Sequence, residues 1–110
     1  MMMDEQEFQL KADEALADLD GALGEAADRH DIEPDFAAGT LTVEFDDPPA
    51  KFVVSPNSPV RQIWVSALTT SFKLDWEAER GEFVLGETGQ SLKELMAEVI
   101  GKQLGESVEL

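Results

Sequence analysis

Apolar residues near the amino terminus recur three or four positions apart, which is the spacing of one face of an α-helix. Between Asp4 and Asp28 the repeating positions are Phe8, Ala12, Ala15, Leu16, Leu19, Leu23 and Ala26. This spacing predicts a long amphipathic helix. Gly21 and Gly24 lie in its second half, and each costs a helix about 1 kcal/mol relative to alanine. We therefore expect the last turns to fray or to end early.

The middle of the chain changes to strict alternation, which is typical of half-buried β-strands. In residues 31–36, Ile32 and Phe36 alternate with three carboxylates, and Pro34 restricts this segment to a sheet edge. Residues 41–45 alternate in the same way, and the sequence Asp47-Pro48-Pro49 predicts a turn after them. Further strands are predicted at residues 51–55, 62–66, 71–76 and 82–85. The pattern indicates an antiparallel meander.

A capping box at Ser91-Leu92-Lys93-Glu94 predicts the start of a second helix. Its apolar face is formed by Leu92, Leu95, Met96, Val99 and Ile100, and Gly101 and Gly105 follow where it should weaken and end. The fold class predicted is α+β, a two-layer α/β sandwich. In it an antiparallel sheet of about six strands carries the N- and C-terminal helices on one face, as a single domain over residues 1–110.

The composition is strongly and unevenly acidic. The chain has 24 Asp and Glu against eight Lys and Arg, a net charge of −16, and residues 1–47 hold 15 of the acids but only two of the bases. This balance argues against nucleic acid or an anionic membrane as a partner and favours cations or basic proteins. No apolar run approaches 18 residues, and the start of the chain does not resemble a secretion signal. We therefore expect a cytoplasmic protein.

Candidate metal ligands are mainly oxygens, because the chain has no Cys and only one imidazole, His30. At about 100° per residue, several carboxylates of the first helix fall within an arc of roughly 80°: Glu7, Glu14, Asp18, Glu25 and Asp28. We expect this stripe to continue as an acidic ridge through Asp31, Glu33, Asp35 and, further on, Glu44 and Asp46. Such a surface suits hard cations bound weakly at open sites, or a basic protein patch. Solvated charge that serves solubility is an equal alternative.

Two familiar kinds of site are not indicated. Residues 31–42 are not an EF-hand loop, because Phe36 replaces the glycine at the sixth position and Thr42 stands at the twelfth. A serine nucleophile with a histidine base is not indicated either, since the one histidine lies in the acidic segment. His30 is open to two interpretations, a metal ligand or a surface residue near the end of the helix, where a positive charge is favourable.

A second candidate site lies in the fourth predicted strand. If Ile63 and Val65 face the helices, alternation places Gln62 and Trp64 on the uncovered face of the sheet. An exposed Trp64 beside Arg61 would form a plausible hot spot for protein binding. The alternative is that Trp64 only covers neighbouring apolar surface. Trp76, in register with Phe72 and Leu74, is expected in the core.

The segment Phe52-Val53-Val54-Ser55 is followed by Pro59, by Gln62-Ile63-Trp64-Val65-Ser66, and by Phe72-x-Leu74-Asp75-Trp76. This succession resembles the frataxin family, and within it the bacterial CyaY type. Gly39-Thr40-Leu41-Thr42-Val43 resembles an earlier strand of the family, and Ser91-Leu92-x-x-Leu95 with Gly105-Glu106-Ser107-Val108 resembles the last helix and tail. The Gln-Ile-Trp segment is the specific part of the match.

The resemblance implies a protein that binds Fe²⁺ and Fe³⁺ weakly and modulates iron-sulfur cluster assembly by binding cysteine desulfurase and its scaffold. It implies no enzymatic activity as the main role, and a monomer that iron could drive into oligomers. The alternative function is iron storage or detoxification with ferroxidase-like activity. By residue, the resemblance assigns iron to Asp20, Glu25, Asp31, Glu33, Asp35 and Asp46, and the desulfurase-facing surface to Gln62 and Trp64. Gly24, Ala27 and Arg29 depart from acidic positions of the family, and Asp28 would compensate.

Overall fold

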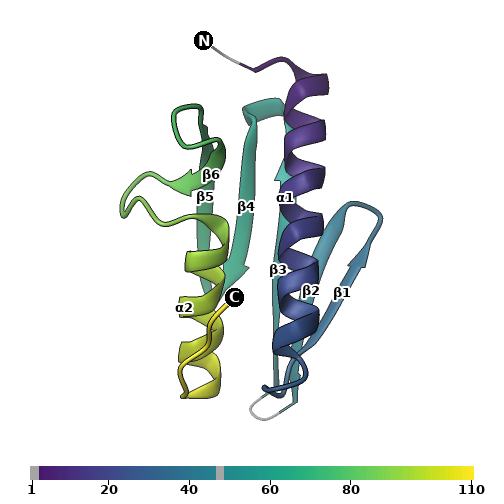
Figure 1. Cartoon of the computed structure of the whole chain (residues 1–110), viewed down its shortest axis with the longest axis vertical. Coiled ribbons are helices and arrows are strands. Elements are labelled where there is room, and N and C mark those ends of the chain that lie inside the picture. The colour runs from purple at the N-terminus through teal and green to yellow at the C-terminus, as the bar shows by residue number, and fades with distance from the viewer. Residues whose placement is uncertain (1–2, 47–48) are drawn as a thin grey trace.

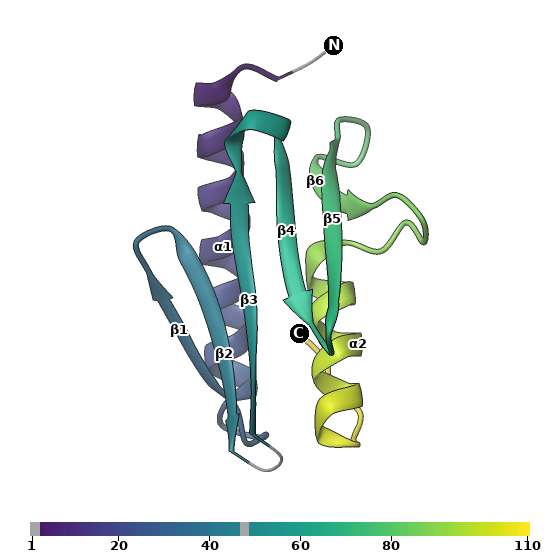
Figure 2. The same ribbon diagram turned by 180° about the vertical axis from the view of Figure 1, so that it is seen from behind.

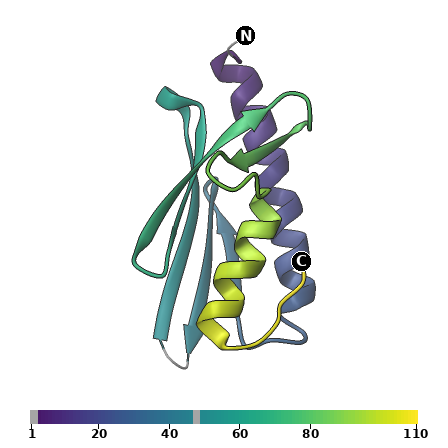
Figure 3. The ribbon, with the colours of Figure 1, turned by 90° about the vertical axis from the view of Figure 1, so that its left-hand side faces the viewer.

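A six-stranded sheet and two helices form two layers in the computed structural model, which describes residues 3–46 and 49–110 (Figures 1 and 3). The helices are α1 (Glu5–Ala26) and α2 (Leu92–Leu104). The strands are β1 (Glu33–Ala37), β2 (Thr40–Asp46), β3 (Pro49–Asn57), β4 (Gln62–Ala67), β5 (Thr70–Glu77) and β6 (Glu82–Leu85), and a 3₁₀ turn, η1 (Ser58–Val60), joins β3 to β4. Both helices cover the same face of the sheet, which confirms the predicted α+β sandwich.

Helix α1 begins at a side-chain cap and ends two residues after its second glycine, Gly24. The carboxylate of Asp4 accepts a hydrogen bond of 2.7 Å from the backbone N–H of Glu7, which satisfies one of the free donors of the first turn. The helix continues through Gly21 and Gly24, although the sequence predicted fraying there, because its apolar face stays buried as far as Ala26. Packing on the sheet outweighs the weak propensity of two residues.

The six strands are all antiparallel, and their order in the sheet is their order in the chain. Strand β1 forms one edge of the sheet, which confirms the prediction made from Pro34. At the other edge, β6 has only four residues, and Val84 forms an isolated bridge with Ser91. Strand β3 is longer than predicted at both ends. The predicted turn at Asp47 and Pro48 lies outside the described residues, and Pro49 already belongs to β3.

Helix α2 has the predicted capping box. The Ser91 hydroxyl accepts from the backbone of Glu94 at 3.2 Å, and the Glu94 carboxylate accepts from the backbone of Ser91 at 2.9 Å. These hydrogen bonds, with Arg80 nearby, lower the pKa of Glu94 below its ordinary value. The helix runs past Gly101 to Leu104, and Gly105 caps its end in a left-handed conformation.

The C-terminal tail folds back against α2 and reaches α1. The backbone N–H of Glu106 donates to the carbonyl of Gly101 at 3.2 Å, and Val108 is buried. The Glu106 carboxylate also lies 2.6 Å from Nδ1 of His30, at the end of α1. His30, left open as a possible metal ligand, therefore joins the tail to the first helix through one of its two ring nitrogens.

The core lies between the two layers and contains the apolar faces of both helices and of every strand from β2 to β6. Its largest fully buried side chains include Phe8 of α1, Ile63 of β4 and Leu95 of α2. The ring of Phe83 packs edge to face on Phe8, with 5.8 Å between the ring centroids. Neither helix of the described chain combines the length and apolar character that crossing a membrane requires.

Candidate functional site

The face of the sheet opposite the helices carries an exposed indole. Ile63 and Val65 are buried under the helices, while Trp64 between them points the other way and is 36% exposed. Figure 2 shows this face of the sheet in front of the helices. In the strand register, Trp64 stands opposite Ser55 on β3 and Lys73 on β5. The predicted placement of Trp64 on the uncovered face is confirmed.

Three side chains of β4 and β5 hold this indole in place. The Nε1–H of Trp64 donates to Oε1 of Gln62 at 2.9 Å, and Nε2 of Gln62 donates to Oδ1 of Asp75 at 3.0 Å. The Lys73 ammonium lies 4.9 Å from the centroid of the Trp64 ring, within the range of a cation–π contact. The sequence predicted Gln62 and Trp64 on this face, but it did not identify Lys73 and Asp75. We call Gln62, Trp64, Lys73 and Asp75 the Trp64 platform.

Arg61 does not belong to the Trp64 platform. Its backbone is left-handed, with a φ of 54°, and its guanidinium donates to the carbonyl of Ser58 and, at 3.3 Å, to the carbonyl of Met3. These contacts tie the β3–β4 connection to the start of the chain. The guanidinium is thus engaged with backbone carbonyls, and a role of Arg61 in binding a partner stays a prediction.

The acidic side chains of α1 lie on two flanks of the helix. Asp18 forms a 2.8 Å ion pair with Lys93 of α2, and Glu14 and Glu25 fall within about 40° of it around the helix axis. Asp20 lies about 160° from Asp18 at the same 100° per residue, on the other flank. Asp20 is half-buried, whereas the other predicted ligands are exposed. The full predicted set is Glu14, Asp18, Asp20, Glu25, Asp28, Asp31, Glu33, Asp35 and Asp46.

The acidic side chains of the first strands lie on the outer face of the sheet. Glu33 of β1 is opposite Glu44 of β2, and Asp35 and Asp46 share their exposed side. Asp28 and Asp31 are exposed in the connection that joins α1 to β1. The predicted carboxylates are thus divided between the helical layer, this connection and the opposite face, and they do not form the single continuous ridge that we expected.

This distribution decides what kind of cation site the chain offers. In residues 3–46 and 49–110 no three histidine, aspartate or glutamate side chains converge closely enough to hold a metal ion. Hard cations prefer oxygen ligands, so the exposed carboxylates suit them chemically. The arrangement fits weak binding by one or two carboxylates, with water as the remaining ligand, better than a rigid chelating site.

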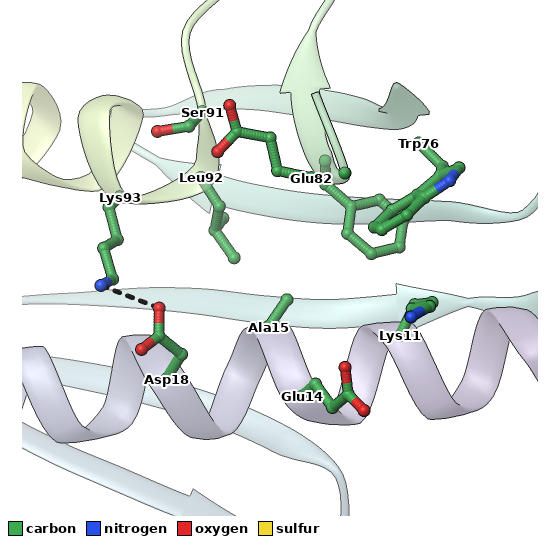
Figure 4. Close-up of a pocket in the computed structure, with 11 residues that line it drawn as sticks. Lys11, Glu14, Ala15, Asp18, Trp76, Glu82, Ser91, Leu92 and Lys93 are labelled. Carbon is green, nitrogen blue, oxygen red and sulfur yellow. Dashed lines mark ion pairs between the residues drawn. The ribbon is translucent and has the colours of Figure 1, made fainter. Parts of the chain in front are cut away.

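A groove of about 340 Å³ runs between α1, β6 and the start of α2 (Figure 4). The Asp18–Lys93 pair closes one end, and Trp76 with Lys11 forms the other, where the Lys11 ammonium is 5.7 Å from the indole centroid. Trp76 packs on Phe83 with 5.1 Å between ring centroids. Trp76 was expected in the core. It is instead half-buried, packed against the edge of the core at one end of this groove.

Most positive charges of the chain are engaged within it. Lys73 and Lys11 lie over indole rings, Arg80 forms a 2.5 Å ion pair with Glu82, and Lys102 is 3.8 Å from Glu98. With a net charge of −16, the field around the protein is therefore predominantly negative. A basic protein surface or a multivalent cation is the partner that such a field attracts.

Comparisons with known proteins agree on one family. The sequence profile of the frataxin-like domain matches residues 1–106. The chain is 33% identical over 79 residues to the iron-sulfur cluster assembly protein CyaY of Azotobacter vinelandii, which covers 72% of this chain and 71% of that protein. It is 30% identical over 90 residues to the CyaY protein of Pseudomonas entomophila, covering 80% and 81%.

Two solved structures share the fold. Frataxin from Psychromonas ingrahamii superimposes with a TM-score of 0.83 at 23% identity, over 97% of each chain. Yeast frataxin gives a TM-score of 0.69 at the same identity, over 91% of this chain and 82% of the other. At this level of identity the superpositions show a common fold.

Proposed function

Because the chain belongs to the frataxin-like family, we propose that it takes part in iron-sulfur cluster assembly by binding cysteine desulfurase and its scaffold protein. Similar proteins carry the name iron-sulfur cluster assembly protein. The proposed role is regulatory rather than catalytic, in a cytoplasmic protein that acts as a monomer and a single domain. The observation that carries this proposal is the Trp64 platform.

The Trp64 platform has the properties of a docking hot spot. Tryptophan is among the residues that contribute most to protein interfaces, and here it stands on β4, which is paired with a strand on each side. Three of its neighbours on the outer face are serines. Ser55 is directly opposite Trp64 on β3, and Ser66 and Ser71 are paired with each other two residues further along β4 and β5. A partner can therefore approach the indole closely.

Iron is the proposed cargo of the exposed carboxylates. The ligands proposed are the predicted set from Glu14 to Asp46, used one or two at a time. Binding of this kind is weak and releases the ion readily, which suits delivery or sensing. Other divalent cations would compete in vitro, because the ligands are oxygens without a fixed geometry.

Calorimetric titration of the protein with purified desulfurase and scaffold tests the docking proposal. Trp64→Ala should weaken binding by at least about tenfold, since interface hot spots contribute roughly 2 kcal/mol or more. Leu10→Ala is the matched control, because Leu10 is an exposed apolar residue of the helical layer. Equal affinities of wild type and Trp64→Ala would refute docking through this face.

Titration with Fe²⁺, with and without oxygen, tests the iron proposal. The triple variant Glu25→Gln, Asp28→Asn, Asp31→Asn should bind iron more weakly while Trp64→Ala binds it as the wild type does. Oxygen consumption with growth of oligomers would instead favour the alternative of iron storage with ferroxidase-like activity. No detectable binding of Fe²⁺ by the wild-type protein would refute an iron role for these carboxylates.

A further inference from the structure

The Trp64 platform contains a side chain whose position suggests a role that the proposed function does not assign. The indole N–H donates to Gln62 and not to Asp75, yet Asp75 accepts a hydrogen bond from the same Gln62 amide. In the register of β4 and β5, Gln62 is directly opposite Asp75, and Trp64 is directly opposite Lys73. Two adjacent cross-strand pairs are thus joined into one network.

The chemistry of donors and acceptors fixes the direction of this network. An indole N–H can only donate, so Gln62 must present its carbonyl oxygen to Trp64. Its NH₂ group then points to the other side, where it requires an acceptor, and an ionised carboxylate accepts without donating. Asp75 is therefore the side chain that sets which way the Gln62 amide faces.

We propose that Asp75 is a positioning residue: through Gln62 it holds the Trp64 indole in the orientation that docks the partner. This inference rests on the proposed docking function of Trp64. Lys73 covers one face of the ring while the Gln62 amide holds its N–H edge, so the indole is held on two sides. A pre-oriented side chain loses less conformational entropy when a partner binds, which favours affinity.

Charged and polar substitutions separate this role from a simple charge effect. Asp75→Asn keeps an acceptor oxygen and should preserve the network, whereas Asp75→Ala removes the acceptor and leaves the amide free to turn. Asp75→Lys places a donor opposite Gln62, so the amide turns its oxygen to the lysine and presents a second donor to the indole N–H. Glu77→Ala is the matched control, because it removes a carboxylate from the same strand and side without touching Gln62.

Fluorescence of Trp64 in the free protein tests the inference without a partner. A Trp76→Phe background leaves Trp64 as the single tryptophan, and circular dichroism verifies the fold of each variant. Asp75→Ala and Asp75→Lys should lower the fluorescence anisotropy of Trp64 and increase its quenching by acrylamide. Asp75→Asn and Glu77→Ala should match the background. Unchanged anisotropy in Asp75→Ala, or an Asp75→Asn variant as mobile as Asp75→Ala, would overturn the inference.

A paired exchange gives a second, independent measurement. Gln62→Glu keeps an acceptor for Trp64 but sets two carboxylates against each other, so the anisotropy should fall. Combining it with Asp75→Lys restores a donor for Glu at position 62, and the anisotropy should recover. Failure of the double variant to recover any order, with its fold intact, would count against the network.

Binding to desulfurase and scaffold then separates the two proposals. Asp75→Ala should weaken binding by about tenfold, the effect of one hydrogen bond to a charged group, and Asp75→Asn should bind as the parent does. If Asp75→Ala loosens the indole but Trp64→Ala binds as tightly as wild type, the docking function fails while the positioning of Trp64 stands. If Trp64→Ala abolishes binding but Asp75→Ala changes neither anisotropy nor affinity, the positioning role fails alone.

Discussion

Replacing Gly101 with alanine should destabilise the protein, although alanine is the better helix former. An ideal Cβ at position 101 would lie 2.9 Å from the carbonyl oxygen of Glu106, closer than real Cβ contacts. The obstacle is backbone, which cannot rotate away like the end of a flexible side chain. The tail must shift, and with it the hydrogen bond from the Glu106 N–H to the Gly101 carbonyl.

The size of the effect follows from what this shift exposes. Alanine gains about 1 kcal/mol over glycine inside a helix, and the lost backbone hydrogen bond costs about the same. Val108 is 9% exposed in the folded chain, and complete burial of a valine contributes about 1.5–3 kcal/mol. A tail that detaches therefore lowers the free energy of unfolding by about 1.5–3 kcal/mol.

Urea denaturation followed by circular dichroism measures this difference, with Gly24→Ala as the matched control. Gly24 also lies inside a helix, but nothing is within 4 Å of its Cβ position, so Gly24→Ala should stabilise the protein by up to about 1 kcal/mol. A Gly101→Ala variant as stable as Gly24→Ala would refute the argument from the close approach of the tail.

Three further outcomes are expected. Thr69→Gly should raise the free energy of unfolding by about 1 kcal/mol, because Thr69 has a φ of 63° in the β4–β5 turn; Thr70→Gly, in β5, is the control and should lower it. Glu94→Gln should destabilise the protein at neutral pH, because the lowered pKa of Glu94 contributes stability there. This contribution is lost as the pH falls through the folded-state pKa, so the urea midpoints of variant and wild type should converge at acidic pH. Association with desulfurase, followed by stopped flow, should slow as salt is raised, because the net charge is −16; a salt-independent rate would contradict electrostatic attraction.

The fold could be predicted from sequence because its signals are local. Alternation placed Ile63 and Val65 on one face of β4 and Gln62 and Trp64 on the other, and the Ser91 capping box predicted the start of α2. The β4–β5 turn was not recognised, because Leu68 and Thr69 occupy left-handed positions that usually carry Asn or Gly. Without that two-residue turn the register was unknown, and the pairing of Trp64 with Lys73 could not be predicted.

The candidate acidic site was predicted less well than the fold. Helical periodicity gives the angular positions of the carboxylates around α1, but it does not show which flank faces α2. The ion pair between Asp18 and Lys93 identifies that flank, and it is visible only in the structure. Alternation likewise placed Glu33 and Asp35 on one side of β1 without showing that this side is the outer face of the sheet. The carboxylates that were expected to form one continuous ridge therefore lie in separate groups, on the helical layer and on the outer face of the sheet.

The two edges of the sheet limit how copies of this protein can associate. At one edge, Pro34 lacks an N–H and Glu33 and Asp35 repel an identical strand; at the other, β6 is short and Ser91 already bridges to it. Growth by strand addition, the route to fibrils, is disfavoured at both ends. Particles that form when cations neutralise the carboxylates should therefore be held by side chains and ions, and should dissolve when a chelator removes the metal.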